Sequence, residues 1–204
     1  MNYSKEELLA NISDLFLTYG LRSTSMDDIC NYLKISKKTL YHIFENKDDV
    51  VEQVMWYRLE YIRKKTTPAE VSKIGPVLFL YDMKKHILEN LNSRIPANYF
   101  DLKKYHPEVD KKIRAEKDKI MKSILKGVLS VGVKEGFFRG EADLELQIFL
   151  LNRSLSFLEE LERPLEADYP VPLLISTIVD NFILSMSTEQ GRKEFEKIKK
   201  EEKI

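Results

Sequence analysis

Apolar residues recur along this chain at intervals of three and four positions, the spacing of helices with one buried face. The first such segment runs from Ser4 to Gly20. Its apolar positions are Leu8, Ile12, Leu15, Phe16 and Tyr19. The pattern predicts a helix that ends at Gly20, because glycine is a common helix stop.

Three short polar residues mark the starts of the next predicted helices. Ser25 is suited to cap a helix that ends near Leu33, and Ser36 a very short helix over residues 37–43. Asn46 is suited to cap a long helix over residues 47–65. The segment 66–75, which carries a proline and a glycine, is predicted to be a loop.

Prolines open the next three predicted helices, because proline fits the first helical turn. The pattern predicts helices over residues 76–92, 96–105, 107–135, 143–162 and 171–187, and a short charged helix from residue 189. No alternating strand pattern exceeds four residues. The sequence therefore predicts an all-α protein of nine or ten helices.

The helices predicted over 143–162 and 171–187 are apolar on more than one face. One stripe of the first contains Leu144, Ile148, Leu151, Leu155 and Leu158, and a second contains Leu146, Phe149, Leu150, Phe157 and Leu161. Two apolar faces need two packing partners. One is the domain core, and the other indicates a second subunit.

Charge is balanced over the whole chain but not within it. The 33 basic residues match the 33 acidic ones, which argues against a protein that coats polyanions everywhere. Residues 34–47, however, carry four lysines against Glu45 alone. This segment is a candidate for local binding to an anionic partner.

The sequence offers no convincing catalytic or metal site. His42, His86 and His106 lack metal-ligand spacing, glycine-rich phosphate loops are absent, and Cys30 is the only cysteine. We therefore expect no enzyme, no cofactor and no metal. The N-terminal residues lack a signal-peptide pattern and no apolar run reaches membrane-spanning length, so a cytoplasmic location without membrane contact is expected.

The two short helices predicted after Ser25 and Ser36 have the spacing of a helix-turn-helix, whose second helix enters the major groove of DNA. Lys37 and Lys38 would lie at the edge of the groove, with Thr39 close to a base or phosphate. Tyr41 and His42 would point outward. Apolar residues at 40, 43 and 44 would pack this helix onto its domain.

Residues 15–51 resemble the DNA-binding domain of TetR-family transcriptional repressors. The matching positions are Phe16, Gly20, Thr24, Ser25, Ile29, Cys30, Ile35, Ser36, Leu40, Tyr41, Phe44 and Lys47. Two positions depart from the pattern, because Lys34 stands where the family usually has glycine and Lys38 where a small residue is common. A left-handed lysine in the turn would cost roughly 1 kcal/mol.

The resemblance implies DNA contacts residue by residue. Thr24, Ser25, Tyr41 and Lys47 would contact phosphates, Ser36 would cap the recognition helix beside the DNA, and Lys37, Lys38, Thr39 and His42 would contact bases or phosphates. It also implies a DNA-binding domain over residues 1–47 and a helical ligand-binding and dimerisation domain over 48–204. The last two long helices would form a four-helix bundle with those of a second subunit.

A ligand pocket in residues 50–160 is the remaining candidate site. Its candidate lining residues are mostly apolar with a few polar groups: Met55, Leu59, Phe79, Met83, His86, Tyr99, Lys117, Met121 and Asn152. Each also has a plainer interpretation. The apolar residues can be core, His86 can lie on a solvated helix edge, and Lys117 can reach out to solvent from a helix edge.

These observations favour a DNA-binding regulator, a repressor that a small, mostly apolar ligand releases from a palindromic operator. The alternative is a DNA-bound regulatory or architectural protein whose helical domain binds a protein partner. A third hypothesis, from another class, is a helical enzyme that carries a DNA-binding domain. An enclosed cavity on the order of several hundred Å³ within residues 50–160 would favour a ligand, and a packed interior the protein partner.

Overall fold

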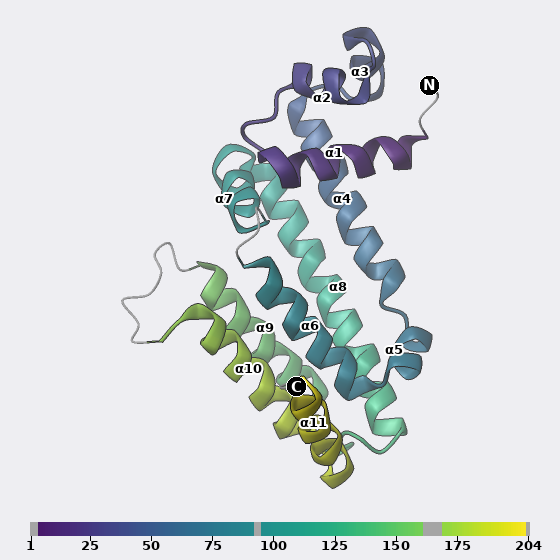
Figure 1. The fold of residues 1–204 in the computed structure, drawn as a ribbon, viewed down its shortest axis with the longest axis vertical. Helices are drawn as coiled ribbons and strands as arrows, with labels where there is room; N and C mark the ends of the chain where they lie inside the picture. Colours follow the sequence, from purple (N-terminus) through teal and green to yellow (C-terminus); the bar gives the residue numbers. More distant parts are fainter. Residues whose placement is uncertain (1–3, 92–94, 161–168, 203–204) are drawn as a thin grey trace. The chain divides into compact units, whose positions relative to one another are not determined.

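A computed structural model describes residues 4–91, 95–160 and 169–202 of the chain, with side chains left out at 157–160. Eleven helices fill this described part, which confirms the all-α prediction (Figure 1). They are α1 (Lys5–Tyr19), α2 (Met26–Leu33), α3 (Lys37–Ile43), α4 (Lys47–Lys65), α5 (Pro68–Ile74), α6 (Pro76–Asn90), α7 (Ile95–Tyr105), α8 (Pro107–Lys134), α9 (Leu144–Glu160), α10 (Val171–Met186) and α11 (Glu189–Glu201). The helices divide between two compact units.

The first unit, Met1–Lys64 with Asn90–Lys119, contains α1 to α4, α7 and the start of α8. Ser4 and Ser25 cap α1 and α2 with reciprocal bonds to the third helical residue. Of these two caps, the sequence predicted Ser25. α1 packs on α2 and α7, and α2 packs on α3. The fully buried side chains at the centre include Ile12, Leu21, Ile29, Leu33, Leu40, Phe44 and Ile113. Each such residue contributes roughly 1.5–3 kcal/mol by burial.

The predicted loop over residues 66–75 is wrong, because most of it forms α5. Thr67 caps this helix by accepting a hydrogen bond from the backbone N–H of Glu70 at 3.3 Å. Pro68 occupies the first turn, and Gly75 ends the helix with φ of 99°. A proline at the start and a glycine at the end therefore delimit a helix here rather than a loop.

The second unit, Lys65–Glu89 with Ile120–Ile204, contains α5, α6, the rest of α8 and the last three helices. An ion pair that the sequence analysis did not predict lies inside it. Lys84 of α6 is only 6% exposed and its Nζ lies 2.6 Å from Asp180 of α10. Lys199 of α11 reaches the other oxygen of Asp180 at 3.2 Å. Asp180 therefore joins three helices, and the burial of Lys84 is offset by this pairing.

α11 packs against α10 and against the turn after α8. Thr188 caps α11, and its backbone N–H donates to the carbonyl of Phe137 at 2.9 Å. Gly191, in the first turns of α11, lies so close to this turn that an added Cβ would sit 2.2 Å from the Phe137 oxygen. The absence of a side chain at Gly191 is what permits this docking.

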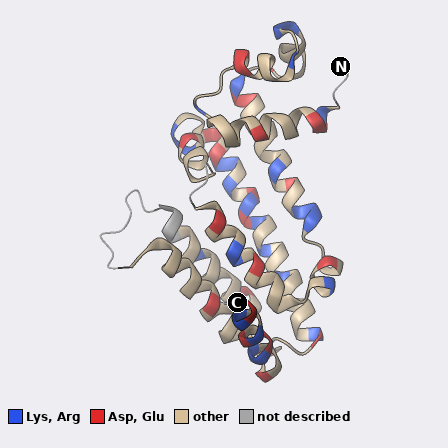
Figure 2. Cartoon of the chain, in the orientation of Figure 1, with Lys and Arg blue, Asp and Glu red and all other residues tan. Residues whose placement is uncertain are grey.

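The helices α9 and α10 pack on each other and carry few charged residues (Figure 2). Ile148 and Leu151 of the first predicted stripe on α9 are buried. On the second stripe Leu146, Phe149 and Leu150 are 49%, 53% and 49% exposed, so the described residues of the unit cover only about half of these side chains. Phe157, Leu158 and Leu161, which complete the two predicted stripes, lie outside the residues whose side chains are described.

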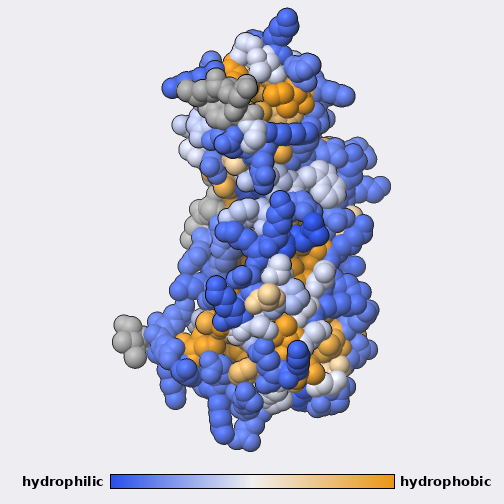
Figure 3. Space-filling model, turned by 90° about the vertical axis from the view of Figure 1, so that its right-hand side faces the viewer, coloured by the Kyte–Doolittle hydropathy of each residue, from blue (hydrophilic) through white to orange (hydrophobic). Residues whose placement is uncertain are grey.

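On the face drawn in Figure 3, hydrophilic side chains dominate, with smaller apolar areas between them. None of the helices in the described residues combines the length and the apolar character needed to span a membrane.

Candidate nucleic-acid interface

The turn between α2 and α3 is tight and includes one residue in a left-handed conformation. Lys34 has φ of 53° and ψ of 43°, so it adopts the left-handed conformation whose cost was given above. The backbone N–H of Ile35 donates to the carbonyl of Cys30 at 3.1 Å and closes the end of α2. The turn therefore keeps its form at the cost of a strained lysine.

Ser36 caps α3, as predicted. Its hydroxyl accepts from the backbone N–H of Thr39 at 3.0 Å and lies 2.8 Å from the Thr39 hydroxyl. Leu40 and Phe44 are almost fully buried and fix α3 on the domain. This packing determines which side of α3 faces outward.

The outward side of α3 carries Lys37, Lys38, Thr39, Tyr41 and His42, all exposed. Tyr41 is 51% exposed. These are the predicted base and phosphate contacts, and the structure brings them together on one short helix next to Lys34. Donors of this kind on an exposed helix are suited to the major groove.

Lys37 has a carboxylate beside it. Its Nζ lies 2.8 Å from Asp27 in the first turn of α2, with both side chains exposed. The hydrogen bond to Asp27 raises the pKa of Lys37 above its ordinary value. The predicted DNA contact of Lys37 would therefore require it to exchange Asp27 for a phosphate or base.

Thr24 and Lys47 occupy positions inside the domain. The Thr24 hydroxyl is buried and donates to the carbonyl of Gly20 at 2.7 Å. The Lys47 ammonium donates to the carbonyls of Leu21, at 3.1 Å, and of Thr24, and lies 4.7 Å from the centre of the Phe16 ring. Burial lowers the pKa of Lys47 to about 8.

These contacts give Thr24 and Lys47 a structural role, since both hold the turn between α1 and α2. Their phosphate contacts stay predictions. Ser25, by contrast, is exposed at the N-terminus of α2. Its hydroxyl accepts from the backbone N–H of Asp28 at 3.1 Å, and the hydrogen bonds from Ser25 lower the pKa of Asp28.

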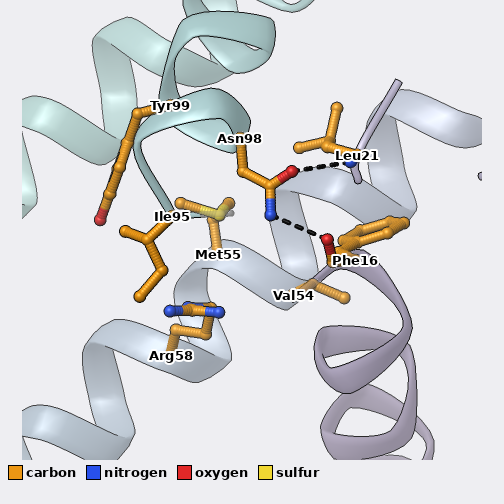
Figure 4. A pocket seen from close by; sticks show the side chains of 8 residues that line it. All are labelled: Phe16, Leu21, Val54, Met55, Arg58, Ile95, Asn98 and Tyr99. Carbon is orange, nitrogen blue, oxygen red and sulfur yellow. Dashed lines mark hydrogen bonds between the residues drawn. The ribbon is translucent and has the colours of Figure 1, made fainter. Parts of the chain in front are cut away.

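A small cavity of about 20 Å³ lies in the same unit, behind the helix-turn-helix. Its walls are Phe16, Leu21, Val54, Met55, Arg58, Ile95, Asn98 and Tyr99 (Figure 4). This volume has room for about one water molecule. It is far smaller than the several hundred Å³ that the sequence analysis associated with a resident ligand.

Asn98 of α7 connects this cavity to the DNA-binding helices. Its amide nitrogen donates to the carbonyl of Phe16 at 2.9 Å, and its amide oxygen accepts from the backbone N–H of Leu21 at 2.8 Å (Figure 4). Asn98 therefore forms hydrogen bonds to the backbone on both sides of the turn that follows α1. Asn98 and Arg58 were missed by the sequence analysis, and no local pattern pairs either with residues of α1.

The predicted pocket residues fall in both units. Met55 and Tyr99 line the cavity, Leu59 is buried in the first unit, and the ammonium of Lys117 lies 5.1 Å from the centre of the Tyr99 ring. The remaining candidates belong to the second unit: Phe79, Met83, His86, Met121 and Asn152. Neither unit by itself brings all nine residues together.

Neither redox nor metal chemistry stands out at this interface. Cys30 is buried in α2, and burial raises the pKa of its thiol, which makes it a poor nucleophile. Over the ranges that the structure describes, His, Cys, Asp and Glu residues form no group of three placed to hold a metal ion.

Comparison with known proteins agrees with this arrangement. Residues 8–54 match the family described as bacterial regulatory proteins, tetR family. The chain is 27% identical over 149 residues to the HTH-type transcriptional repressor KstR2 of Rhodococcus jostii (strain RHA1), covering 70% of this chain and 71% of that one. Such relatives are transcriptional regulators rather than enzymes.

Solved structures share the fold. A TetR transcription regulator from Haloarcula marismortui ATCC 43049 aligns with a TM-score of 0.62 at 18% identity, covering 90% of this chain and 97% of that one. The TetR-family regulator PfmR from Thermus thermophilus aligns with a TM-score of 0.50 at 22% identity, covering 86% and 96%.

Proposed function

We propose that this chain, which belongs to the TetR family of transcriptional regulators, is a repressor that binds a two-fold symmetric operator as a homodimer in the cytoplasm. The observation that carries the proposal is the outward side of α3. There Lys37, Lys38 and Tyr41 stand exposed on a helix whose other side is buried through Leu40 and Phe44. The similarity to a curated repressor supports repression over activation.

A homodimer is supported by the unpaired apolar face of α9. Leu146, Phe149 and Leu150 are each about half exposed, and Leu173 of α10 is 51% exposed. α10 carries one charged residue, Asp180, which points into its own unit's ion network. A second copy of the chain that covers this face would bring a second α3, so the pair would read two half-sites related by two-fold symmetry.

Release by a small, mostly apolar ligand is supported by the contacts around the cavity. α4 begins at Lys47, which holds the turn before α2, and it continues to Met55 and Arg58 in the cavity wall. Asn98 fastens the same turn to α7. A ligand that parts α4 from α7 would therefore disturb the DNA-binding helices. Its affinity must offset the cost of enlarging a cavity of about 20 Å³.

Selection and sequencing of DNA fragments by the purified protein tests the proposal. We expect an enriched inverted repeat whose half-site centres lie about one helical turn, 34–36 Å, or a multiple of it apart. Tyr41→Ala serves as the comparison variant and should lose the enrichment. Fragments enriched without a common sequence, or equal enrichment by Tyr41→Ala, would contradict the proposal.

The same selection, repeated with a metabolite extract, tests release. An effector in the extract should reduce recovery of the inverted repeat. The effector should also bind free protein more tightly than DNA-bound protein, by the same factor by which it weakens DNA binding. An extract component that binds both forms equally is not the effector, because it cannot shift the equilibrium.

A further inference from the structure

Arg58 of α4 gives the cavity behind the helix-turn-helix one cationic wall. The partner of this cation is a neutral group. The guanidinium of Arg58 donates to the hydroxyl of Ser13 at 3.4 Å. This is a long contact to a neutral group, while a guanidinium offers five donors. In the ranges that the structure describes, no carboxylate forms an ion pair with Arg58.

The carboxylates near Arg58 on α4 are already engaged. Glu52 pairs with Lys112 of α8 at 2.9 Å, and Glu60 pairs with Arg63 at 2.7 Å. The cation of Arg58 therefore remains available for an anion from outside the chain. The rest of the cavity wall is chiefly apolar, with the side chains of Met55 and Ile95 beside Arg58 (Figure 4).

We infer that the effector is a small organic carboxylate, whose anionic group pairs with Arg58 and whose apolar body inserts between α4 and α7. This inference rests on the proposed regulator function and specifies its ligand. A carboxylate matches the planar fork of a guanidinium with two parallel hydrogen bonds. A single cation suits one negative charge better than the larger charge of a phosphate.

The position of Arg58 explains how such a ligand would act on DNA binding. The free cavity has a volume of about 20 Å³, so an apolar body of several carbons enters only if α7 moves away from α4. That movement pulls Asn98 from the carbonyl of Phe16 and the N–H of Leu21. The turn that Lys47 and Thr24 hold then loses its hydrogen bonds to α7. As a result, α2 and α3 are no longer fixed in position.

The test uses hexanoate and octanoate as probes, with 1-hexanol and 1-octanol as neutral partners of equal length. Operator affinity is measured by fluorescence anisotropy for the full-length protein with and without each probe. We expect a carboxylate to weaken operator binding by about 5- to 150-fold, the usual range of coupling between two sites. The alcohols should change it less than about twofold, because they lack the charge that Arg58 recognises.

Two variants localise the effect. The response of each variant is the ratio of its operator affinities without and with the probe. Arg58→Gln should show no response to the carboxylate. Arg63→Gln changes an exposed arginine on the same helix, already paired with Glu60, and should respond as the wild type does. Equal responses to carboxylate and alcohol, or a full response in Arg58→Gln, would overturn the inference.

A direct measurement of carboxylate binding to the protein without DNA tests the inference independently of the proposed function. Calorimetry of octanoate with free protein should show binding that Arg58→Gln weakens at least about tenfold, as expected when a charged hydrogen-bond partner is removed. Absence of carboxylate binding would overturn the inference even if the protein binds its operator. Absence of any specific DNA binding would overturn the proposed function, whatever calorimetry shows.

Discussion

Lys47 illustrates how a single residue at the interface serves the fold. Its ammonium lies among backbone carbonyls of the α1–α2 turn and next to the Phe16 ring, and burial lowers its pKa from 10.5 to about 8. In the unfolded chain the same group keeps its proton up to about pH 10.5. The unfolded state therefore binds more protons than the folded state between these two values.

It follows that the free energy of unfolding should gain a rising contribution from Lys47 between about pH 8 and pH 10.5. Below pH 8 the buried charge costs stability in full, and above pH 10.5 the cost is gone. Urea unfolding of wild type and Lys47→Gln across this window isolates the effect, because glutamine keeps a donor but does not titrate. Stability curves that run parallel for the two proteins would show that Lys47 is not held as described.

Asp27 gives a second prediction at the residue scale. Its carboxylate lies 2.8 Å from the Nζ of Lys37, so Asp27→Asn frees Lys37 and removes a negative charge beside the proposed DNA-binding helix. We expect tighter binding to operator and to unrelated DNA alike, by up to about fivefold, the range typical of exposed ion pairs.

Asp14→Asn, an equally conservative change at an exposed position of α1, serves as its control and should have less effect. Anisotropy titrations at two salt concentrations measure both variants. If Asp14→Asn and Asp27→Asn strengthen binding equally, net charge rather than Lys37 accounts for the change.

At the scale of elements, Gly191 and Gly127 offer a matched pair in the second unit. Alanine at Gly191 would place its Cβ 2.2 Å from the Phe137 oxygen, whereas at Gly127 of α8 the nearest atom would be 3.9 Å away. We expect Gly191→Ala to lower the free energy of unfolding by roughly 1–3 kcal/mol. Gly127→Ala should raise it by about 0.5–1 kcal/mol, because alanine favours a helix interior.

Thermal or urea unfolding distinguishes these outcomes. A stable Gly191→Ala protein would mean that α11 does not dock closely against the turn after α8.

Helix positions were largely predictable because their signals are local. Ser4, Ser25 and Ser36 each cap the helix that follows, and Gly20 and Gly136 follow helix ends with positive φ. The error at α5 has the same origin: Thr67, Pro68 and Gly75 are cap signals, but seven helical residues between them show too little periodicity to be distinguished from a loop.

The contacts that make up the site were less predictable because they join distant parts of the chain. Asn98 bonds to residues 77 and 82 positions earlier in the sequence, and Arg58 reaches Ser13 across 45 positions. Lys84 occupies a position that periodicity assigns to an apolar residue, and its burial depends on Asp180, 96 positions later. The outward face of α3, by contrast, was predictable because all of its residues lie in one short segment of the sequence.

At the scale of the whole molecule, the proposed dimer rests on the exposed apolar face of α9. Phe149→Glu places a charge at the centre of this face and should convert the protein to a monomer. Two linked half-sites bind far more tightly than one, so operator affinity should fall by about 100-fold or more.

Phe100→Glu, at a 60% exposed position of α7, is the control and should leave the assembly state unchanged. Sedimentation at micromolar concentration measures assembly, and anisotropy measures binding. A Phe149→Glu protein that remains a dimer would exclude this face as the interface.

Sequence-specific binding by a dimer is tested most directly by the affinity of the wild-type protein for its selected inverted repeat. This affinity is compared with that for a duplex in which one half-site is scrambled and one in which both are. We expect the intact repeat to bind at least about 1,000-fold more tightly than the fully scrambled duplex at physiological salt. The duplex with one intact half-site should bind with an intermediate affinity. Equal affinity for all three duplexes would contradict sequence reading by α3, and equal affinity for the intact and half-scrambled duplexes would contradict a dimer that reads two half-sites.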